Sequence, residues 1–292
     1  MKHIKKTQEK NAKCSRPVSV PNFNKYVKTL ANERELTMEY NNIVELTKQN
    51  DTNLRRVETA AEDLDACYIN SPLGDKEYIL GLAPTTSLQY QFWKMIIDEK
   101  VENIVLFASM EDIKNEKFAK YWPDHCSNKS VSYSDGCSKI KITILADKRS
   151  SSYDMHHFKI EQASTVVKTR FWHFTNCDKR GTSRHLDSFL LFLQGLQFIE
   201  RSLQHPILVH SICGLNASTD LFILLDICIR QAKQDGVVDM CYQVRKLRTQ
   251  QPNCIATVEE YLFAHQYLDK YFSLPSYAYV YDHNPIIYFA NK

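Results

Sequence analysis

The stretch from residue 207 to residue 220, ILVHSICGLNASTD, constrains the fold more than any other part of this chain. Its apolar start, 207–209, is typical of a short buried strand, and residues 218–236 have the pattern of a helix. Because DLFILLDICI is apolar on nearly every side, we expect this helix to lie inside a hydrophobic core. A strand that turns through small residues into a helix directs backbone N–H groups and the positive end of the helix dipole at the turn. The stretch therefore predicts an α/β core with an anion-binding loop.

Further elements are expected on both sides of this stretch. Apolar runs predict strands at residues 78–82, 103–108, 139–145 and 206–210. Helical spacing predicts helices at 86–99, from 186 onwards and, after a Thr257-Val-Glu-Glu260 capping box, through about Phe272. Helix and strand patterns alternate from about residue 30 to residue 272, with no Gly/Pro-rich linker and no repeat, which favours one continuous α/β domain.

The expected ends of this domain follow from charge and composition. The first 28 residues carry eight Lys or Arg side chains and one Glu, so we expect residues 1–28 to form a basic, mobile arm. Residues 29–272 would form the domain. Residues 273–292 form a tail rich in Tyr and Pro, whose packing the sequence does not predict.

Charge and cysteine content argue against several classes of protein. The formal net charge is only +3 over 292 residues, which does not favour a nucleic-acid partner. No segment resembles a signal peptide, and no run reaches the roughly 18 apolar residues that a membrane helix needs. We therefore expect a cytoplasmic protein without a membrane segment. The nine cysteines contain no C-x-x-C pair, so we expect no metal, no disulfide framework and no cofactor.

Several short motifs resemble, in the same order, those of protein tyrosine phosphatase domains. Cys67-Tyr-Ile-Asn-Ser71 is similar to D-Y-I-N-A of that family, and Tyr78-Ile-Leu-Gly-Leu-Ala-Pro84 is similar to Y-I-A-T-Q-G-P. The later marks are Phe92-Trp93 with Met95, Glu111, Tyr121-Trp122-Pro123 and His173-Phe174-Thr175. The resemblance spans about residues 30–272 and implies a protein tyrosine phosphatase-like fold, with a twisted, mostly mixed central sheet flanked by helices. The short, divergent chain most resembles the tyrosine phosphatase-like proteins of bracoviruses, polydnaviruses of parasitoid wasps.

The resemblance places residues 210–219 at the signature loop of the family, H-C-x-x-G-x-x-R-[ST]. The thiolate nucleophile of the family is replaced by Ser211, whose hydroxyl is a poor nucleophile unless a base removes its proton. The phosphate-binding arginine is replaced by Ala217, which removes two charge-assisted hydrogen bonds of about 1.5–3 kcal/mol each. The second glycine becomes Asn216, which tolerates a left-handed backbone. We expect the loop to keep its shape and to lose its chemistry.

Other catalytic positions of the family are also changed. The acid loop W-P-D-x-G aligns with residues 177–181, where Lys179 stands at the acid position and Asp178 precedes it. In the family, the histidine before the nucleophile supports the loop from behind, so the resemblance implies a structural role for His210. The substrate-stacking tyrosine and two glutamines of the family are replaced by Val44, Ala256 and Glu260.

We interpret the chain as a pseudophosphatase without catalytic residues. Its anion loop, the degenerate cradle of this family, consists of His210, Ser211, Ile212, Cys213, Gly214, Leu215, Asn216, Ala217 and Ser218. The expected function is protein binding, with host phosphoproteins as candidate partners. If the chain is viral, it would act as a virulence factor in the cytoplasm of parasitised insect cells. The oligomeric state is not predicted.

Two alternatives stay open. A weak or altered tyrosine phosphatase would use Cys213 as a relocated nucleophile and Asp178 as the acid. A shift of two residues, however, moves the sulfur from the bottom of the loop, where the N–H groups converge, to its wall, which disfavours attack on a bound phosphate. A drifted copy without a selected role is the second alternative.

Overall fold

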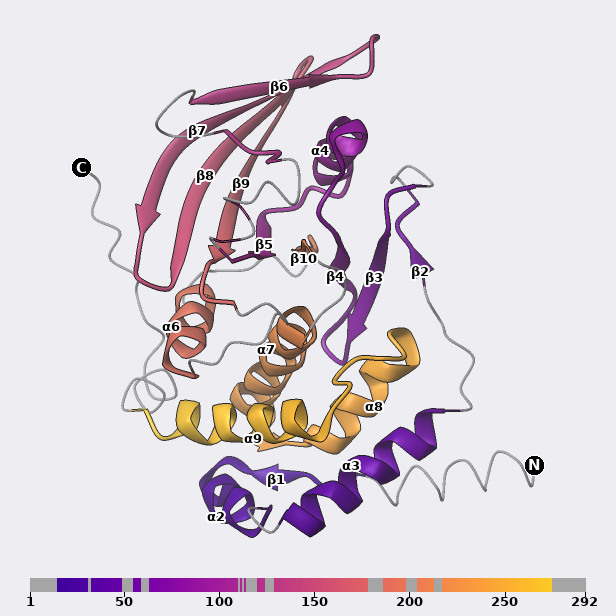
Figure 1. Ribbon diagram of the computed structural model, residues 1–292, viewed down its shortest axis with the longest axis vertical. Helices are drawn as coiled ribbons and strands as arrows, with labels where there is room; N and C mark the ends of the chain where they lie inside the picture. Colours follow the sequence, from indigo (N-terminus) through magenta and orange to yellow (C-terminus); the bar gives the residue numbers. More distant parts are fainter. Residues whose placement is uncertain are drawn as a thin grey trace. The chain divides into compact units, whose positions relative to one another are not determined.

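The computed structural model of the chain describes residues 15–30, 33–48, 55–58, 63–109, 111, 113, 120–123, 129–177, 186–197, 204–212 and 217–274 (Figure 1). The chain divides into two compact units, and each is described by itself. The first unit comprises Met1–Asn53 with Asp220–Lys292, and the second comprises Leu54–Thr219. The expectation of a single domain over residues 29–272 stays a prediction.

The second unit is built on a mixed sheet with nine strands among the described residues. In chain order these are β2 (Arg55–Arg56), β3 (Ala66–Ser71), β4 (Gly74–Leu82), β5 (Asn103–Phe107), β6 (Ser130–Ser134), β7 (Lys139–Arg149), β8 (Tyr153–Gln162), β9 (Thr165–Phe174) and β10 (Ile207–Ser211). Their spatial order is β2-β3-β4-β10-β5-β9-β8-β7-β6. The neighbours β4, β10, β5 and β9 run parallel, and the remaining pairs are antiparallel. The mixed sheet expected from the resemblance is confirmed.

The expected alternation of helix and strand is wrong between residues 130 and 174. This stretch forms the four antiparallel strands β6, β7, β8 and β9, which lie side by side in Figure 1. The strand predicted at 139–145 continues to Arg149. Its buried residues Ile140 and Ile142 alternate with exposed lysines, which is the pattern of a strand that buries one face. Short turns connect these strands, so no crossover helix is needed.

Two helices pack on opposite faces of this sheet. The helix predicted at 86–99 begins as the 3₁₀ turn η1 (Thr86–Leu88) and continues as α4 (Gln89–Asp98), whose Trp93 ring lies 6.0 Å from that of Phe158. The helix predicted from residue 186 is α6 (Leu186–Gln197), whose Phe189 ring lies 6.1 Å from that of Phe107. Leu106 lies in the same core cluster as Trp93 of α4, whereas its neighbour on β5, Phe107, contacts α6. Because neighbouring side chains of a strand point to opposite faces, α4 and α6 cover different faces of the sheet.

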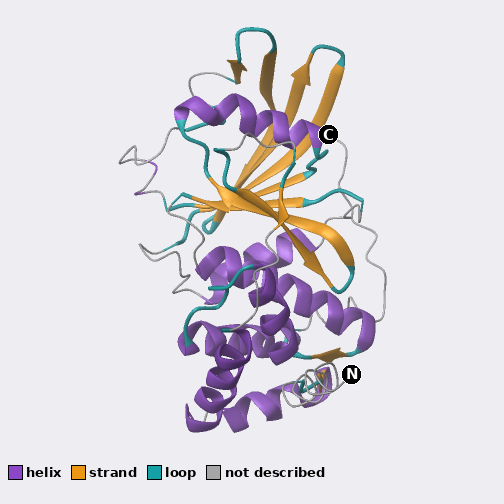
Figure 2. Ribbon diagram, turned by 90° about the vertical axis from the view of Figure 1, so that its right-hand side faces the viewer, coloured by secondary structure: helices purple, strands orange, loops and turns teal. Residues whose placement is uncertain are grey.

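The first unit consists mainly of helices, drawn in purple in Figure 2. They are α2 (Val20–Leu30), α3 (Glu33–Thr47), α7 (Ala217–Asp235), α8 (Met240–Gln250) and α9 (Val258–Phe272). Two short strands, β1 (Val18–Ser19) and β11 (Val237–Val238), pair antiparallel in this unit. The boundary between the units falls between Thr219 and Asp220, in the first turn of α7. The helix predicted at 218–236 is therefore confirmed to within one residue at each end, and its central residues are buried as expected.

The structure differs from the expected basic arm over residues 18–28, because this part of the chain is folded. Phe23 on α2 is 1% exposed, and its ring lies 5.3 Å from that of Phe272 on α9. Lys25 and Lys28 lie on the exposed side of the same helix. An amphipathic helix thus combines a basic surface with a buried apolar stripe, and counting charges alone misses the stripe. Residues 1–14 lie outside the described part.

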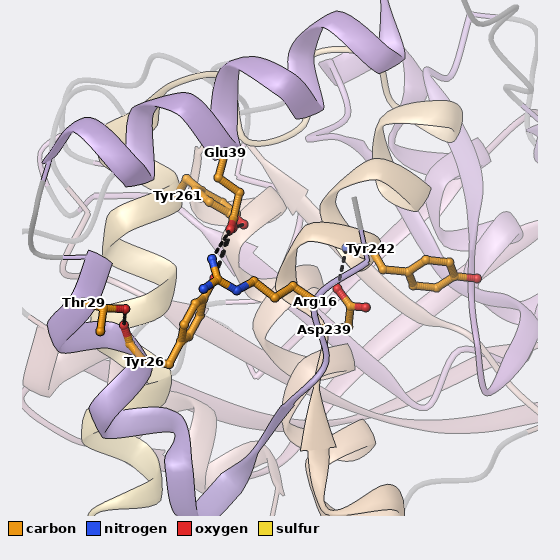
Figure 3. Close-up of polar contacts among 7 residues, drawn as sticks. All are labelled: Arg16, Tyr26, Thr29, Glu39, Asp239, Tyr242 and Tyr261. Carbon is orange, nitrogen blue, oxygen red and sulfur yellow. Dashed lines mark hydrogen bonds and ion pairs between the residues drawn. The ribbon is translucent and has the colours of Figure 1, made fainter. Parts of the chain in front are cut away.

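A carboxylate on α3 holds this N-terminal segment in the first unit (Figure 3). The Glu39 carboxylate accepts hydrogen bonds from the hydroxyls of Tyr26, at 3.2 Å, and Tyr261, at 2.5 Å. The guanidinium of Arg16 lies 3.4 Å from the same carboxylate and 4.8 Å from the centre of the Tyr26 ring. Burial, followed by the charge of Glu39, raises the pKa of both tyrosines well above the ordinary range. Segments far apart in the sequence are therefore joined at Glu39.

Candidate functional site

The central strand β10 positions the first half of the anion loop. It lies between β4 and β5, and Ser211, its last residue, pairs with Leu82 on one side and Phe107 on the other. The backbone N–H of Ala83 donates a hydrogen bond of 2.9 Å to the carbonyl oxygen of Ser211. Ser211 is completely buried. In open α/β sheets, ligands bind beyond the carboxyl ends of parallel strands, and Ser211 occupies such an end.

The helix α7 positions the second half of the loop. Ala217 is its first residue, and the next two residues, Ser218 and Thr219, are buried. The first N–H groups of a helix have no partner within the helix, so this end attracts an anion. The methyl group of Ala217 adds no charge and no donor to it. Backbone dipoles are therefore present at this position, and a cationic side chain is not.

The middle of the anion loop lies outside the described residues. This applies to Cys213, Gly214, Leu215 and Asn216, so the predictions for their backbone and for the Cys213 thiol stay predictions. Ile212 is described, and it packs against the core cluster of the second unit. Asp178 and Lys179 of the expected acid loop also lie outside the described residues. The chain before them is described as far as Cys177, whose thiol donates to the carbonyl oxygen of Phe174 at 3.5 Å.

His210, the first residue of the anion loop, lies on β10 and is buried in the core of the second unit. Its Nε2 shares a hydrogen bond of 2.8 Å with the hydroxyl of Tyr121, and its ring lies 5.4 Å from that of Phe92. Burial, followed by the positive charge that His173 can carry, lowers the pKa of His210 to about 3. The imidazole is therefore neutral at physiological pH.

The position of His210 excludes it as a base for Ser211. The two residues are adjacent on β10, and adjacent side chains of a strand project to opposite faces of the sheet. The imidazole is directed into the aromatic core around Tyr121, so the alternation of the strand assigns the Ser211 side chain to the other face. Sequence neighbours are thus separated by the sheet itself, and the contacts of His210 are those of a structural residue.

The expected substrate-stacking and glutamine positions belong to the first unit. Val44 is half-buried on α3, within a helix. Glu260 takes part in the cap of α9: its backbone N–H donates to the Thr257 hydroxyl at 3.2 Å, and its carboxylate accepts from the backbone N–H of Ala256 at 2.8 Å. The capping box predicted at 257–260 is present, although the carboxylate reaches the residue before the N-cap.

Asp220 is an unusual residue that the sequence patterns did not single out. Its side chain lies at the start of an almost wholly apolar helix and is buried. Burial, followed by the negative charge of Glu260, raises the pKa of Asp220 to about 7, although the N–H of Ile255 and the charge of Arg248 oppose the shift. The signal that could have identified Asp220 in the sequence is a carboxyl group inside an apolar stretch. Only packing reveals how little water it contacts.

We expect Asp220→Asn to stabilise the protein increasingly as the pH rises from 5 to 8. The folded state of the native chain keeps a proton on Asp220 up to about pH 7, whereas the unfolded state loses it near pH 4. The folded state therefore binds more protons in this window, so its stability falls as the pH rises. The advantage of the Asn variant should grow by about 1–3 kcal/mol, because one pKa unit corresponds to about 1.4 kcal/mol. Urea unfolding at both pH values measures it.

The exposed Asp235 at the other end of α7 offers a matched control. Asp235→Asn removes the same charge from an exposed position instead of a buried one. Its effect on the free energy of unfolding should therefore be nearly the same at both pH values. If Asp220→Asn shows an equally flat difference between pH 5 and pH 8, Asp220 is ionised in the folded state like an ordinary aspartate, and its proposed burial penalty is wrong.

The described residues contain neither a helix long and apolar enough to span a membrane nor a cluster of three or more His, Cys, Asp or Glu side chains suited to a metal. The described cysteines Cys67, Cys137, Cys177, Cys228, Cys241 and Cys254 are free thiols.

Comparison with known proteins gives consistent matches over most of the chain. A family model described as protein-tyrosine phosphatase matches residues 24–270. Receptor-type tyrosine-protein phosphatase U of Gallus gallus is 28% identical over 204 residues, which cover 69% of this chain and 14% of the relative. Tyrosine-protein phosphatase Lar-like of Caenorhabditis elegans is 26% identical over 204 residues, which cover 69% of this chain and 9% of the relative. Receptor-type tyrosine-protein phosphatase alpha of Homo sapiens is 26% identical over 223 residues, 75% of this chain and 27% of the relative. The chain thus spans less than a third of each of these relatives.

Proposed function

Because the chain belongs to the protein-tyrosine phosphatase family, we propose that it is a catalytically inactive member, a pseudophosphatase that acts by binding proteins. One observation carries the proposal: Ser211 ends β10 and Ala217 begins α7. Phosphoester hydrolysis in this family depends on a thiolate at the first position and a guanidinium at the second. A serine hydroxyl needs a base to become a nucleophile, and the adjacent His210 is directed to the opposite side of the sheet.

The balance of electrostatic terms favours weak phosphate binding at the anion loop. Loss of two charge-assisted hydrogen bonds from an arginine removes roughly 3–6 kcal/mol. The remaining N-terminus of α7 contributes about 0.3–1 kcal/mol, and at most about 2. The loss exceeds the remaining attraction, so partners are proposed to bind through surfaces outside the anion loop.

The well-packed core supports a binding role rather than a chain that has lost its fold. Trp93 and Tyr121 are completely buried, and the indole N–H of Trp93 donates to the carbonyl oxygen of Tyr121 at 3.0 Å. The hydroxyl of Tyr121 in turn contacts His210, the first residue of the anion loop. The aromatic packing that supports a family signature loop is therefore present, while the reactive side chains are replaced. A rigid scaffold of this kind suits protein binding.

The resemblance to bracovirus proteins extends the proposal to a biological setting. We propose that the protein acts in the cytoplasm of parasitised insect cells, as a virulence factor that binds host phosphoproteins or the partners of active phosphatases. The names of the curated relatives describe tyrosine-protein phosphatases. This chain spans only a small share of the length of those relatives.

We expect phosphotyrosine peptides to bind no more tightly than about 100 µM. The missing guanidinium at Ala217 and the missing aromatic ring at Val44 remove the charge and the stacking that hold such a ligand. Calorimetric titration with a panel of phosphotyrosine peptides measures the affinity, and the unphosphorylated peptides provide the reference.

Ala217→Glu gives a matched control for this titration. A carboxylate in the first turn suits the helix dipole and should leave α7 intact, but it repels a phosphate in the anion loop. A submicromolar complex that Ala217→Glu abolishes would mean that the loop is a working phosphopeptide trap, and partner binding elsewhere would no longer be the proposed mode.

A further inference from the structure

A pocket of about 350 Å³ lies in the second unit, away from the anion loop. Its walls include Glu102, Leu145, His157, Lys168 and Arg170. The volume is within the range of about 300–1,000 Å³ that is usual for small-molecule sites. We call it the basic pocket, because three of its wall residues are basic side chains.

The register of β8 and β9 brings the three basic side chains to one face of the sheet. Lys168 and Arg170 are two positions apart on β9, so both project to the same side, and Arg170 pairs directly with His157 on β8. The alternate residues Phe158 and Phe171 lie in the core cluster on the α4 side. The basic residues are therefore on the opposite face, which is the face that α6 covers farther along the strands.

The two permanent cations of the basic pocket have no acidic partner among the described residues. Within the part of the chain that the structure describes, neither the Lys168 ammonium nor the Arg170 guanidinium forms an ion pair or a side-chain hydrogen bond. The acid of the pocket, Glu102, is instead engaged by His205, whose Nδ1 lies 2.9 Å from its Oε1. His157 pairs directly with Arg170 across the two strands, and burial, followed by the charge of Arg170, lowers the pKa of His157.

One wall of the basic pocket is apolar. Leu145 lies at an irregularity of β7, between Ile144 and Ala146, and is 52% exposed. A bulge at this point redirects side chains locally, and such bulges are over-represented beside binding sites. A large exposed aliphatic side chain beside two cations that have no acidic partner in the described part of the chain favours a ligand with an anionic end and an organic body.

The basic pocket and the anion loop lie at opposite ends of the parallel strands. Arg170 pairs with Asn103 at the start of β5, whereas Ser211 pairs with Phe107 at its end. Four residue steps along a strand correspond to about 13 Å. The basic pocket is therefore not part of the degenerate signature loop, and a ligand in it would leave that loop open.

From this geometry we propose that the basic pocket binds a small organic phosphate monoester. The phosphate would contact Lys168 and Arg170, and the organic part would lie against Leu145. Inorganic phosphate fills only part of the volume, so it should bind more weakly than an ester. The proposal does not depend on whether the anion loop is catalytically active.

Calorimetric titration with ribose 5-phosphate tests the proposal, with ribose and inorganic phosphate as comparison ligands. We expect a saturable complex with a Kd between about 10 µM and 1 mM, no binding of ribose, and inorganic phosphate binding about tenfold more weakly. The ring protons of His157 should shift in NMR spectra on addition of the ester. Absence of saturable ester binding, or equal binding of ribose, would overturn the proposal.

Variants separate the basic pocket from other anion sites. Lys168→Gln and Arg170→Gln should each weaken ester binding about tenfold or more. Lys141→Gln is the control: it removes a charge from β7, on the sheet face that carries the basic pocket but outside the pocket, and should have no effect. Ala217→Glu should also leave binding unchanged. Binding that survives both pocket variants, or that disappears in Ala217→Glu, places the ester elsewhere and overturns the proposal. If Arg170→Gln does not fold, the exposed Lys168 decides the outcome alone.

Discussion

The purified protein is expected to release no phosphate from aryl phosphates above a buffer blank, and Ser211→Cys alone is expected to leave it inactive. Thiolate formation and the charge of the transition state both depend on a guanidinium at the position of Ala217, and residues that act as a unit fail together. The Ser211→Cys/Ala217→Arg double variant should regain a trace of turnover. Turnover by the wild-type protein and the two variants is measured as release of a coloured phenol from an aryl phosphate, with enzyme in excess and a long incubation.

A control at Cys213 distinguishes this expectation from the alternative hydrolase. Cys213→Ser should change nothing, because the wild-type protein is expected to be silent. Turnover by the wild-type protein that disappears in Cys213→Ser would establish a relocated thiol and refute the pseudophosphatase proposal. Robust turnover in Ser211→Cys alone would mean that the guanidinium is dispensable in this loop. Matching urea unfolding curves must accompany each assay, so that silence is not confused with loss of the fold.

Trp93→Ala is expected to lower the free energy of unfolding by about 3–5 kcal/mol, which is a large part of the stability of an ordinary domain. The Trp93 side chain is completely buried, and its ring lies 5.9 Å from that of Tyr121 and 6.0 Å from that of Phe158. The substitution leaves a cavity between α4 and the sheet and removes the indole donor to the Tyr121 carbonyl oxygen. Urea unfolding followed by circular dichroism measures the change.

Two variants calibrate this result. Trp93→Phe keeps most of the apolar contact but loses the hydrogen bond, so it should have a smaller effect, of about 1–3 kcal/mol. Leu191→Ala removes a side chain on α6 that is 54% exposed, and it should change stability by less than about 1 kcal/mol. If Trp93→Ala were no more destabilising than Leu191→Ala, the aromatic residues around Tyr121 and His210 would not form a tightly packed core, which would contradict the proposed role of this core as a scaffold for binding.

Elements whose signals are local were predictable from the sequence. The strand at 206–210 and the helix at 218–236 appear as β10 and α7, each displaced by at most one residue. The last helix begins after Thr257, as its capping box predicts. Apolar runs, helical periodicity and caps depend only on neighbours a few residues away, and these neighbours are visible in the sequence.

Elements with weak local signals were not predictable in the same way. β8 contains His156, His157 and Lys159 among its apolar residues, which hides its alternation. It becomes a strand because β7 and β9 pair with it on both sides over nearly its whole length. The short helix α2 gives a weak signal within the expected basic arm for a similar reason: its buried Phe23 packs against Phe272, far along the chain.

The sequence by itself determined the family of the chain and the identity of the residues at its reactive positions. Ser211 and Ala217 are single letters within an ordered motif, so the proposed loss of thiol and guanidinium is an inference from the sequence that needs no coordinates. Only the tertiary structure decided how the surrounding side chains are used. His210 and Tyr121 are 89 positions apart and share a buried hydrogen bond, which turns a histidine beside the nucleophile position into a core residue. Asp220 is desolvated beside Glu260, and Lys168 and Arg170 line a pocket with Glu102, for the same physical reason: burial and charge are set by groups that folding brings together from distant parts of the chain.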